Sequence, residues 1–319
     1  METVFLHYPS LTLDAPRKPA VVAIGMFDGV HQGHQAVVAK ARALATELGL
    51  ECVVFTFVTH PRTVLRPDTP IPLLTTWDEK SACLAQLGVD RLVGAQFTQS
   101  FAELGAEDFV RRILQEQLQA RHVVVGYNFA FGHNQSGTID TLRELGPQCG
   151  FDVTVVPPFT ADGGPISSSR IRKLLATGHI EDANRLLGRP YSLTGVVVQG
   201  DQRGRLLGFP TANLQCDDQK LLPAFGVYAG HARWEGQSNP CVVNLGMRPT
   251  FDPPQLRIEA HLLDFTGDLY GRTMTLDLLH RLRPEQAFKG IEALVEQIKA
   301  DVRRAKELLD LAPVPDRRV

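Results

Sequence analysis

The ten residues GMFDGVHQGH, at positions 25–34, decide the fold of the first half of the chain. A short apolar stretch rich in valine, residues 20–25, leads into them and predicts a buried β-strand. An alanine-rich segment with helical periodicity, residues 33–48, follows them. Glycines let the backbone turn sharply, and a strand-to-helix turn presents free amides and the positive end of a helix dipole. The stretch therefore predicts a phosphate-binding turn within an α/β fold.

Two histidines in this turn, His31 and His34, are the candidates for its chemistry. Because they are three positions apart at the start of a helix, both side chains can face the same ligand. Imidazoles placed there can donate to phosphate oxygens and stabilise charge that develops at phosphorus. The stretch matches neither the GxGxxG fingerprint nor the P-loop, and no third residue with suitable spacing indicates zinc. The structural alternative is a histidine pair that only caps the helix.

Around this turn, the first half of the chain alternates strand-like and helix-like stretches. Further strands are expected at residues 51–58, 91–95, 122–126 and 151–156. Helices are expected at residues 77–87, 106–119, 138–145, 168–176 and 180–187. This alternation predicts βαβ units, and so a doubly wound parallel sheet covered on both faces. Ligands of such sheets bind in the crevice at the carboxyl ends of the strands.

The pattern of expected secondary structure changes after residues 188–190. Short β-like segments follow at residues 192–199, 225–234, 241–245, 256–265 and 273–282, separated by turn residues. Several short strands at this spacing predict a small β-barrel. A long amphipathic helix is expected at residues 284–309, with Pro284 at its start, and a frayed tail after it. We therefore expect two domains, residues 1–187 and 188–319.

The composition is that of an ordinary folded protein, with 319 residues, 44% of them apolar, and a net charge of −2. It excludes a mainly disordered chain and gives no broad basic face for nucleic acid. The five cysteines include no CxxC pair, which argues against a disulfide framework and against zinc. No signal-peptide pattern is present, and no apolar run approaches the roughly 20 residues of a membrane span. We expect a cytoplasmic protein with neither nucleic-acid nor membrane partners.

Three further stretches of the first half follow predicted strands or begin a helix: FVTHPR at 57–62, VGYNFAFG at 125–132 and ISSSRIR at 166–172. In an open α/β sheet these positions belong to the ligand crevice. The serine run suits a helix N-cap. Together with Arg172, one turn later, it can also hold a polyphosphate whose leaving group the arginine clamps.

The second half carries a glycine-studded loop, GDQRGRLLGFPTAN at residues 200–213. Its glycines permit backbone contact with phosphate, and Thr211 and Asn213 offer neutral oxygens to Mg²⁺. The stretch RIEAHL at 257–262 alternates polar and apolar residues, so that Glu259 shares a strand face with its polar neighbours. That face can line the cleft of a barrel.

These motifs, together with NLGMRPTF at 244–251, resemble those of bacterial bifunctional riboflavin kinase/FAD synthetases. The resemblance covers about residues 18–310, and the motifs occur in the family's order. Residues 25–34 resemble the HxGH signature of the nucleotidyltransferase superfamily. The resemblance implies that the barrel phosphorylates riboflavin with ATP to give FMN. It also implies that the α/β domain joins FMN to AMP from a second ATP, giving FAD and pyrophosphate, with Mg²⁺ in both sites.

The resemblance further implies the residues of the two sites. The catalytic residues it implies are His31, His34, Arg172 and Glu259, the last as the base that accepts the riboflavin hydroxyl proton. In the first domain it implies that ATP and FMN are bound by Gly25, Phe27, Asp28, Gly33, His60, Asn128, Ser168 and Ser169. In the second it implies that ATP and riboflavin are bound by Gly200, Gly204, Gly208, Pro210 and Asn244, and Mg²⁺ by Thr211 and Asn213.

Three positions depart from the family's pattern: Met26, Ala130 and Ser169. They leave open a riboflavin kinase whose N-terminal domain only binds flavin or nucleotide. A second alternative is a flavin-responsive regulator that binds nucleic acid and has no enzymatic activity. The near-neutral charge argues against that alternative.

Overall fold

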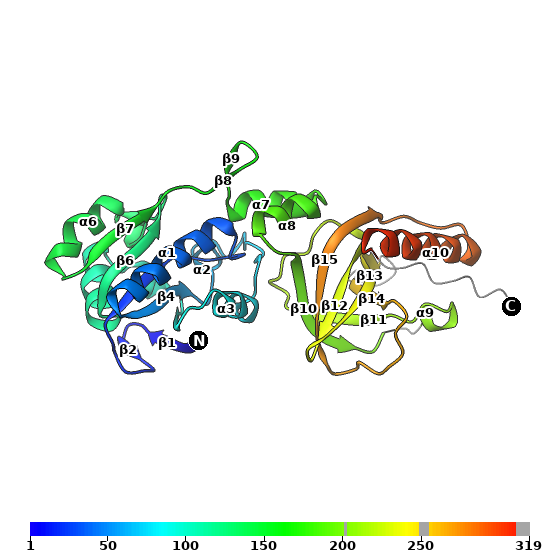
Figure 1. Cartoon of the computed structure of the whole chain (residues 1–319), viewed down its shortest axis with the longest axis horizontal. Coiled ribbons are helices and arrows are strands. Elements are labelled where there is room, and N and C mark those ends of the chain that lie inside the picture. Colours follow the sequence, from blue (N-terminus) through cyan, green and yellow to red (C-terminus); the bar gives the residue numbers. More distant parts are fainter. Residues whose placement is uncertain (201–202, 249–254, 311–319) are drawn as a thin grey trace. The chain divides into compact units, whose positions relative to one another are not determined.

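The computed structural model describes residues 1–200, 203–248 and 255–310 and divides into two compact units, Met1–Ser168 and Ser169–Val319 (Figure 1). Three segments lie outside the described residues: residues 201–202 of the glycine loop, residues 249–254, which include the end of the 244–251 stretch, and the expected tail at 311–319. Within the described ranges, no helix is both long enough and apolar enough to cross a membrane.

The first unit contains a seven-stranded sheet with the order β2-β1-β5-β4-β3-β6-β7. Its strands are β1 (Glu2–His7), β2 (Thr12–Leu13), β3 (Ala20–Ile24), β4 (Glu51–Phe57), β5 (Arg91–Ala95), β6 (Ala120–Gly126) and β7 (Asp152–Val156). Neighbouring strands are parallel, except for the antiparallel pair β1–β2. The direction of the strand order reverses at β3, which lies between β4 and β6. The predicted parallel sheet is confirmed, while β1 and β2 were not predicted.

Helices cover both faces of this sheet because the buried strands are apolar on both sides. Val22 of β3 lies in one hydrophobic core with Ile113 of the π-helix η1, while Ala23 lies in a second core with Val38 of α1. The helical elements of the unit are α1 (Gln32–Leu48), α2 (Pro61–Leu65), α3 (Trp77–Gln86), α4 (Gln99–Ala102), α5 (Ala106–Asp108), η1 (Phe109–Gln117), η2 (His133–Gln135) and α6 (Ile139–Gln148). A small hairpin follows, formed by β8 (Thr160–Ala161) and β9 (Gly164–Pro165). The doubly wound architecture is therefore confirmed.

The second unit contains a closed six-stranded barrel with the order β10-β11-β14-β13-β12-β15. Its strands are β10 (Tyr191–Val198), β11 (Ala212–Cys216), β12 (Gly226–Trp234), β13 (Gln237–Arg248), β14 (Gln255–Leu262) and β15 (Thr273–Pro284), all paired antiparallel. Its helices are α7 (Ser168–Ala176), which begins at the last residue of the first unit, α8 (Ile180–Leu187), α9 (Arg203–Leu206) and α10 (Ile291–Leu308). The predicted barrel is confirmed, and β11 is an addition to it.

The closing helix begins later than the sequence predicts. Pro284 is the last residue of β15, where it pairs with Gly226 of β12, and helix α10 begins only at Ile291, after Gly290. Proline is tolerated at this strand end, and Gly290 adopts a φ of 111° that favours glycine. The prediction that Pro284 starts the helix was therefore wrong, because pairing with β12 extends the strand through it.

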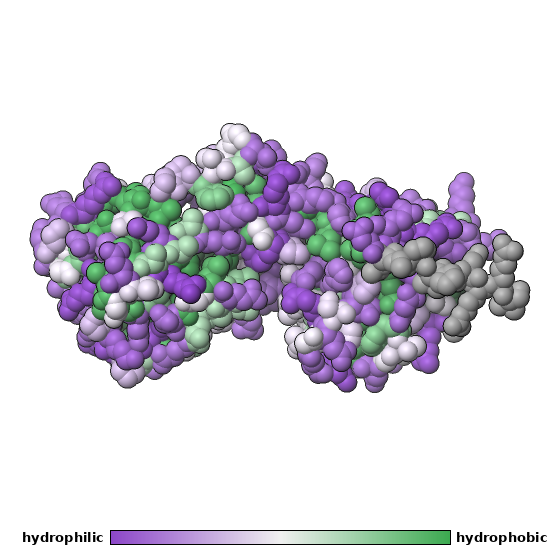
Figure 2. Space-filling view, in the orientation of Figure 1, coloured by the Kyte–Doolittle hydropathy of each residue, from purple (hydrophilic) through white to green (hydrophobic). Residues whose placement is uncertain are grey.

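Helix α10 covers the outside of the barrel. Ala305 lies with Val227 and Val242 in a small hydrophobic core, and Asp301 forms an ion pair with Arg283 of β15 at 2.9 Å. Figure 2 shows hydrophilic residues over most of the visible face of each unit, with hydrophobic residues in smaller groups between them. This is the distribution expected where each unit keeps its own core.

Candidate active sites

The two histidines of the turn after β3 lie side by side at the start of α1. His31 is the N-cap of the helix and is 5% exposed, and its Nδ1 accepts a hydrogen bond from the main-chain N–H of His34 at 3.3 Å. An accepting Nδ1 places the proton of the neutral ring on Nε2, which is then a donor. The two imidazole rings stack with 3.6 Å between their centroids. The pair can therefore present donors to an anion at a helix N-terminus.

The backbone of this turn is strained. Phe27 and Val30 have φ angles of 49° and 40°, in a region that is unfavourable for a β-branched residue such as Val30. Each such residue costs about 1–3 kcal/mol, and strain of this kind persists where the surrounding structure holds it and clusters at functional sites. A Cβ on Gly33 would lie 3.1 Å from Cε1 of His31, so the absence of a side chain lets the imidazole fold over the helix start.

Asp28 holds the strained turn in place from inside the unit. Its carboxylate is 4% exposed and accepts hydrogen bonds from the main-chain N–H groups of Leu74 and Thr75 at 3.3 and 3.1 Å. The hydroxyl of Thr75 in turn accepts from the N–H of Gly29 at 3.0 Å. These contacts give Asp28 an anchoring role, and its contact with a substrate stays a prediction.

Phe27, which was predicted to bind substrate, lies in the core behind the histidines. Its side chain is 1% exposed, and its ring meets that of His34 edge-on at 5.4 Å. A Cβ on Gly25 would lie 3.2 Å from Cζ of Phe27, so the glycine makes room for this ring. Phe27 therefore packs against the His34 ring, and Gly25 leaves the space that the Phe27 ring occupies.

Two other predicted residues of the first unit follow its central strands, and a third, Ser168, begins α7 after the β8–β9 hairpin. His60, the N-cap of α2, follows β4, and Asn128 is exposed in the loop after β6. Ser168 donates from its hydroxyl to the main-chain oxygen of Asp28 at 2.9 Å, which ties the serine run to the histidine turn. These segments belong to the carboxyl edge of the sheet around β3, where the strand order reverses and ligands bind in such folds.

Ser169 and Arg172 belong to the second unit, on α7. Their part in the first site stays a prediction. Two aromatic residues of the 125–132 loop belong to the core, since Phe131 is 8% exposed and stacks on Phe129 at 5.5 Å, whereas Tyr127 is exposed.

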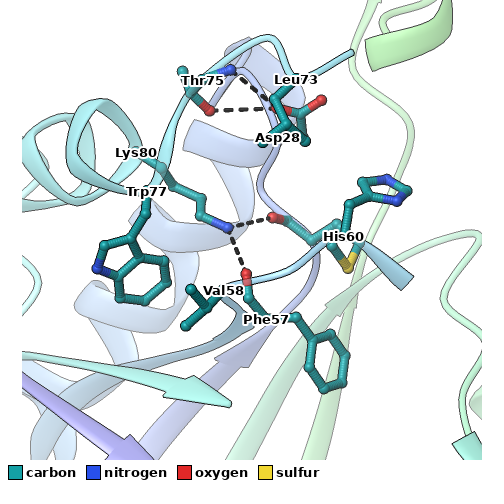
Figure 3. A pocket seen from close by; sticks show the side chains of 9 residues that line it. Asp28, Phe57, Val58, His60, Leu73, Thr75, Trp77 and Lys80 are labelled. Atoms are coloured by element: carbon teal, nitrogen blue, oxygen red, sulfur yellow. Dashed lines mark hydrogen bonds between the residues drawn. The ribbon is translucent and has the colours of Figure 1, made fainter. Parts of the chain in front are cut away.

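One residue near the first site was missed by the sequence analysis. Lys80 of α3 is 5% exposed and lines a small pocket next to Asp28 and His60 (Figure 3). Burial lowers the pKa of Lys80 to about 8, against the opposing effect of the Asp28 charge. The sequence did offer a sign that Lys80 is buried. Lys80 lies at helical spacing between Trp77 and Leu84 and so shares their apolar face.

The second candidate site is a row of polar residues across three strands of the barrel. Asn213 of β11 pairs with Glu259 of β14, and Glu259 pairs with Asn244 of β13. Residues directly opposite each other on neighbouring strands point to the same face. The guanidinium of Arg257 lies 2.9 Å from the Glu259 carboxylate, and both side chains are about one-fifth exposed. The predicted shared face of the 257–262 stretch is therefore confirmed.

The glycine loop leads into this row. A Cβ on Gly200 would overlap the amide of Asn213, and a Cβ on Gly204 would overlap the main-chain oxygen of Phe209. Gly208 has a φ of 84°. Nδ1 of His261 lies 2.8 Å from the main-chain oxygen of Pro210, a hydrogen bond that ties the loop to β14. The loop is therefore fixed to the strand that carries Glu259.

The oxygen atoms of this second site fit a hard cation. Thr211 and Asn213 contribute neutral oxygens, and the register places the carboxylate of Glu259 beside Asn213. Mg²⁺ prefers such ligands and is commonly bound through few protein groups together with substrate phosphates. Among the described residues, no group of three or more His, Cys, Asp or Glu could hold a metal ion. A magnesium site here would therefore depend on these oxygens and on the nucleotide.

The five cysteines are all free, and Cys52, Cys149 and Cys241 are buried. Burial raises the pKa of Cys52 to about 12, so this thiol stays protonated at neutral pH and is a poor nucleophile.

Two family models match the chain, described as FAD synthetase over residues 14–170 and as riboflavin kinase over residues 187–309. A protein of Listeria monocytogenes is 38% identical over 303 residues, which are 94% of this chain and 96% of the relative. A protein of Pseudomonas fluorescens is 41% identical over 289 residues, 90% and 92% of the two chains. Both are named bifunctional riboflavin kinase/FMN adenylyltransferase.

A solved structure is similar over nearly the whole chain. It is a crystal structure that carries the name macrolide-efflux protein, from Streptococcus pneumoniae. It is 32% identical, has a TM-score of 0.87, and the match covers 96% of this chain and 99% of that one. The similarity thus extends over both compact units.

Proposed function

We propose how two reactions divide between the units of this chain, which belongs to the family of bifunctional riboflavin kinase/FMN adenylyltransferases. The barrel transfers the γ-phosphoryl group of ATP to riboflavin and so gives FMN. The α/β unit joins FMN to the adenylyl group of a second ATP and releases pyrophosphate, which gives FAD. The observation that carries the proposal is that each unit holds a site of its own, the stacked histidines in one and the polar strand row in the other.

In the kinase reaction, Glu259 accepts the proton of the riboflavin hydroxyl that attacks the γ-phosphorus. Arg257 holds the carboxylate of Glu259 in place through their 2.9 Å contact. The glycine loop brings main-chain N–H groups to the phosphates of ATP. Thr211 and Asn213 would hold Mg²⁺, which neutralises charge on the phosphate oxygens when bound. Positioning and electrostatic stabilisation supply most of the catalysis in phosphoryl transfer.

In the adenylyl transfer, a phosphate oxygen of FMN attacks the α-phosphorus of ATP. The bond from this phosphorus to the bridging oxygen breaks, and pyrophosphate leaves with the electron pair. No nucleophile from the protein is required. The Nε2–H of His31 and the N-terminus of α1 stabilise the negative charge that develops at phosphorus, with His34 beside them. Arg172 is proposed to clamp the departing pyrophosphate.

The two functional domains are proposed to be residues 1–187 and 188–319. This division keeps Ser168, Ser169 and Arg172 with the histidines in one functional domain. Residues 171–186 match neither family model, and the compact units divide at 168. The proposed partners are ATP, riboflavin and FMN. Free thiols are typical of a reducing compartment, which supports the cytoplasm as the proposed location.

Product analysis tests this proposal. The protein is incubated with riboflavin, ATP and Mg²⁺, and flavins are separated by chromatography while ADP and pyrophosphate are measured. We expect one ADP for each riboflavin converted and one pyrophosphate for each FAD formed. Chelation of Mg²⁺ serves as the control and should stop both reactions.

The alternatives give different products. FMN without FAD, even when FMN is supplied, would favour a kinase whose N-terminal domain only binds ligands. No flavin product, together with salt-dependent binding of DNA or RNA, would favour the non-enzymatic regulator.

A further inference from the structure

The ammonium of Lys80 lies inside the first unit, against main-chain oxygens of two different segments (Figure 3). Its Nζ donates to the oxygen of Phe57 at 2.8 Å and to that of Met26 at 3.4 Å. The Thr56 hydroxyl lies 3.4 Å from Nζ and itself donates to the Met26 oxygen at 3.0 Å. The side chain therefore joins the start of the histidine turn to the end of β4.

Both segments lead to residues assigned to the nucleotide site. Met26 lies in the strained turn that carries His31, and Phe57 begins the stretch that carries His60. Two neutral hydrogen bonds also join these segments, since the Thr56 hydroxyl donates to the Met26 oxygen and the N–H of Gly25 donates to the Phe55 oxygen at 3.3 Å. Lys80 adds a charged link that extends this connection to the Phe57 oxygen, where β4 ends.

The choice of a charged group at this position needs a physical reason. Burying an ammonium is unfavourable unless it is paired and hydrogen-bonded, and a merely structural link could be made by a neutral side chain. An ammonium has three donors and makes stronger hydrogen bonds to carbonyls than a neutral group does. The indole of Trp77, whose ring centre is 5.3 Å from Nζ, shields it from water. The charge therefore fixes the carbonyls tightly.

We propose that Lys80 is a positioning residue for adenylyl transfer, whose ammonium holds the Met26 and Phe57 carbonyls so that His31 and His60 keep the spacing that the reaction requires. This inference rests on the proposed function of the first unit. Lys80 acts through these segments and does not itself touch the reacting atoms.

The position of Lys80 also makes this function depend on pH. Burial lowers the pKa of Lys80 to about 8, and Asp28 is the charged group that opposes this effect. Other titratable groups on the elements packed around it are His60, in the same pocket, and Glu79 of α3, whose carboxylate accepts from the N–H of Thr76. Helix α3 also carries Asp78 and Cys83, and β4 carries Glu51 and Cys52. As pH rises through about 8, the ammonium loses a donor and its charge, and adenylyl transfer should slow.

Stability should change in the opposite direction over the same range. In the unfolded chain, Lys80 keeps its proton up to its ordinary pKa of 10.5, whereas in the folded chain it releases it near 8. The unfolded state therefore binds more protons between these values, so the contribution of Lys80 to the free energy of unfolding rises with pH. Deprotonation of Lys80 therefore does not destabilise the folded protein. A loss of activity above pH 8 that depends on Lys80 is thus not caused by unfolding.

The test compares Lys80→Met, which keeps the length of the side chain, with Lys40→Met on the exposed face of α1. In the full-length protein, the kcat for FAD formation from FMN should fall about 10²-fold in Lys80→Met, as a small displacement of reacting groups does. The KM for ATP should change little, and riboflavin phosphorylation by the same preparation should match the parent. Lys40→Met should match the parent in both reactions.

The pH profile gives a readout that a purely structural role would not change. The parent's FAD formation should decline above pH 8, and this decline should be absent in Lys80→Met. Lys80→Arg, which stays protonated, should recover part of the turnover and also lack the decline. If Lys80→Met forms FAD at the parent rate, or if the activity of the parent stays constant from pH 7 to 9.5, this inference is overturned and the proposed function is not. A parent that forms no FAD would overturn the proposed function and this inference with it.

Discussion

The two candidate sites are built in different ways. The first depends on a strained turn, in which the buried Asp28 carboxylate and the helix start hold Phe27 and Val30 at positive φ angles. The second places its polar groups on neighbouring strands, where the hydrogen-bonded register sets Asn213 and Glu259 side by side. One site therefore depends on a special backbone conformation, and the other on an ordinary strand ladder.

This difference predicts different responses to mutation. In the strand row, exchanging one polar side chain alters the chemistry and leaves the ladder intact, because the main chain makes the register. In the turn, a residue without a reacting side chain, such as Gly33, should also affect the reaction, because the position of the His31 ring depends on the space that Gly33 leaves. Mutations at the two sites separate these effects, since each reaction has its own product.

The largest effect is expected for Glu259→Gln in the strand row. Glutamine keeps the volume and hydrogen-bonding shape but does not accept the proton, so riboflavin phosphorylation should fall by about 10²–10⁴-fold. FAD formation from added FMN should be near that of the parent, and unfolding should be unchanged. The measurement is initial rates of both reactions with separated flavins.

Glu235→Gln is the matched control for this variant, because Glu235 is an exposed carboxylate of the same unit, paired with Arg272. Its loss should leave both rates unchanged, as expected of a surface ion pair. If Glu259→Gln phosphorylates riboflavin at the parent rate, Glu259 is not the base.

The next largest effect is expected for alanine at His31 or His34. Removing one preorganised charge stabiliser should lower FAD formation from FMN by about 10²–10³-fold. Riboflavin phosphorylation should barely change, because it takes place in the other unit. His7→Ala, at an exposed position of β1, is the control and should affect neither rate. Equal loss of both activities would instead indicate misfolding, or a histidine pair with a structural role only.

A smaller effect is expected for Gly33→Ala, which tests the turn without removing a chemical group. The added Cβ would lie 3.1 Å from the His31 ring, so the imidazole must move by a few tenths of an ångström. FAD formation should fall about tenfold, while alanine's helix propensity favours the folded state by up to about 1 kcal/mol. The measurement is kcat together with thermal unfolding.

Gly105→Ala is the comparison for this variant, because the space around Gly105 is open and its φ is negative. It should leave FAD formation unchanged. Parent-level turnover in Gly33→Ala would show that the histidine turn tolerates displacement, and the contrast between the two sites would be lost.

The smallest effect on turnover is expected for truncation between the two units. Fragments 188–319 and 169–319 should both phosphorylate riboflavin at the parent rate, because both contain the strand row. They should differ in stability, since Asn184 of α8 donates to the Leu278 oxygen at 2.8 Å and accepts from the Tyr191 N–H at 2.7 Å. Loss of these bonds and of the buried face of α8 should lower the free energy of unfolding by about 3 kcal/mol or more.

Thermal unfolding of the two fragments measures this difference, which should appear as a midpoint lower by roughly 10 °C for fragment 188–319. An inactive or insoluble 188–319 would contradict the proposed domain boundary. Equal midpoints would show that α8 contributes nothing to the barrel.

Much of the fold could be predicted from the sequence, because apolar runs and helical periods reflect burial directly. The strands around the histidine turn and the change to short strands after residue 190 are local patterns of this kind. The N-terminal strand β1 has no such pattern, and its place depends on pairing with β5, which lies far away in sequence. Pro284 gave a local signal for a helix start, but the pairing of β15 with β12 outweighed it.

The candidate sites were predictable where a motif carries the chemistry and unpredictable where a distant residue supports it. His31, His34 and Glu259 stand in recognisable stretches, and the face shared by Glu259 and Arg257 follows from strand alternation. The bonds from Asp28 to residues 74–75 and from Lys80 to two carbonyls join segments about 20–50 positions apart. Such contacts arise only when the chain folds, although Lys80 within an apolar helix face was a usable signal.

Closure of the barrel has a consequence for the order in which the chain folds during synthesis. β10 pairs with β15, the last strand to emerge, so the barrel stays open until residues 273–284 have been made. The sheet of the first unit is complete once β7 has emerged, at Val156. Domains generally fold from the N-terminus as units, and distant strand pairs form slowly. The adenylylating unit can therefore fold first, while unpaired edges of the kinase barrel stay exposed to aggregation and to chaperones until residues 273–284 have been made.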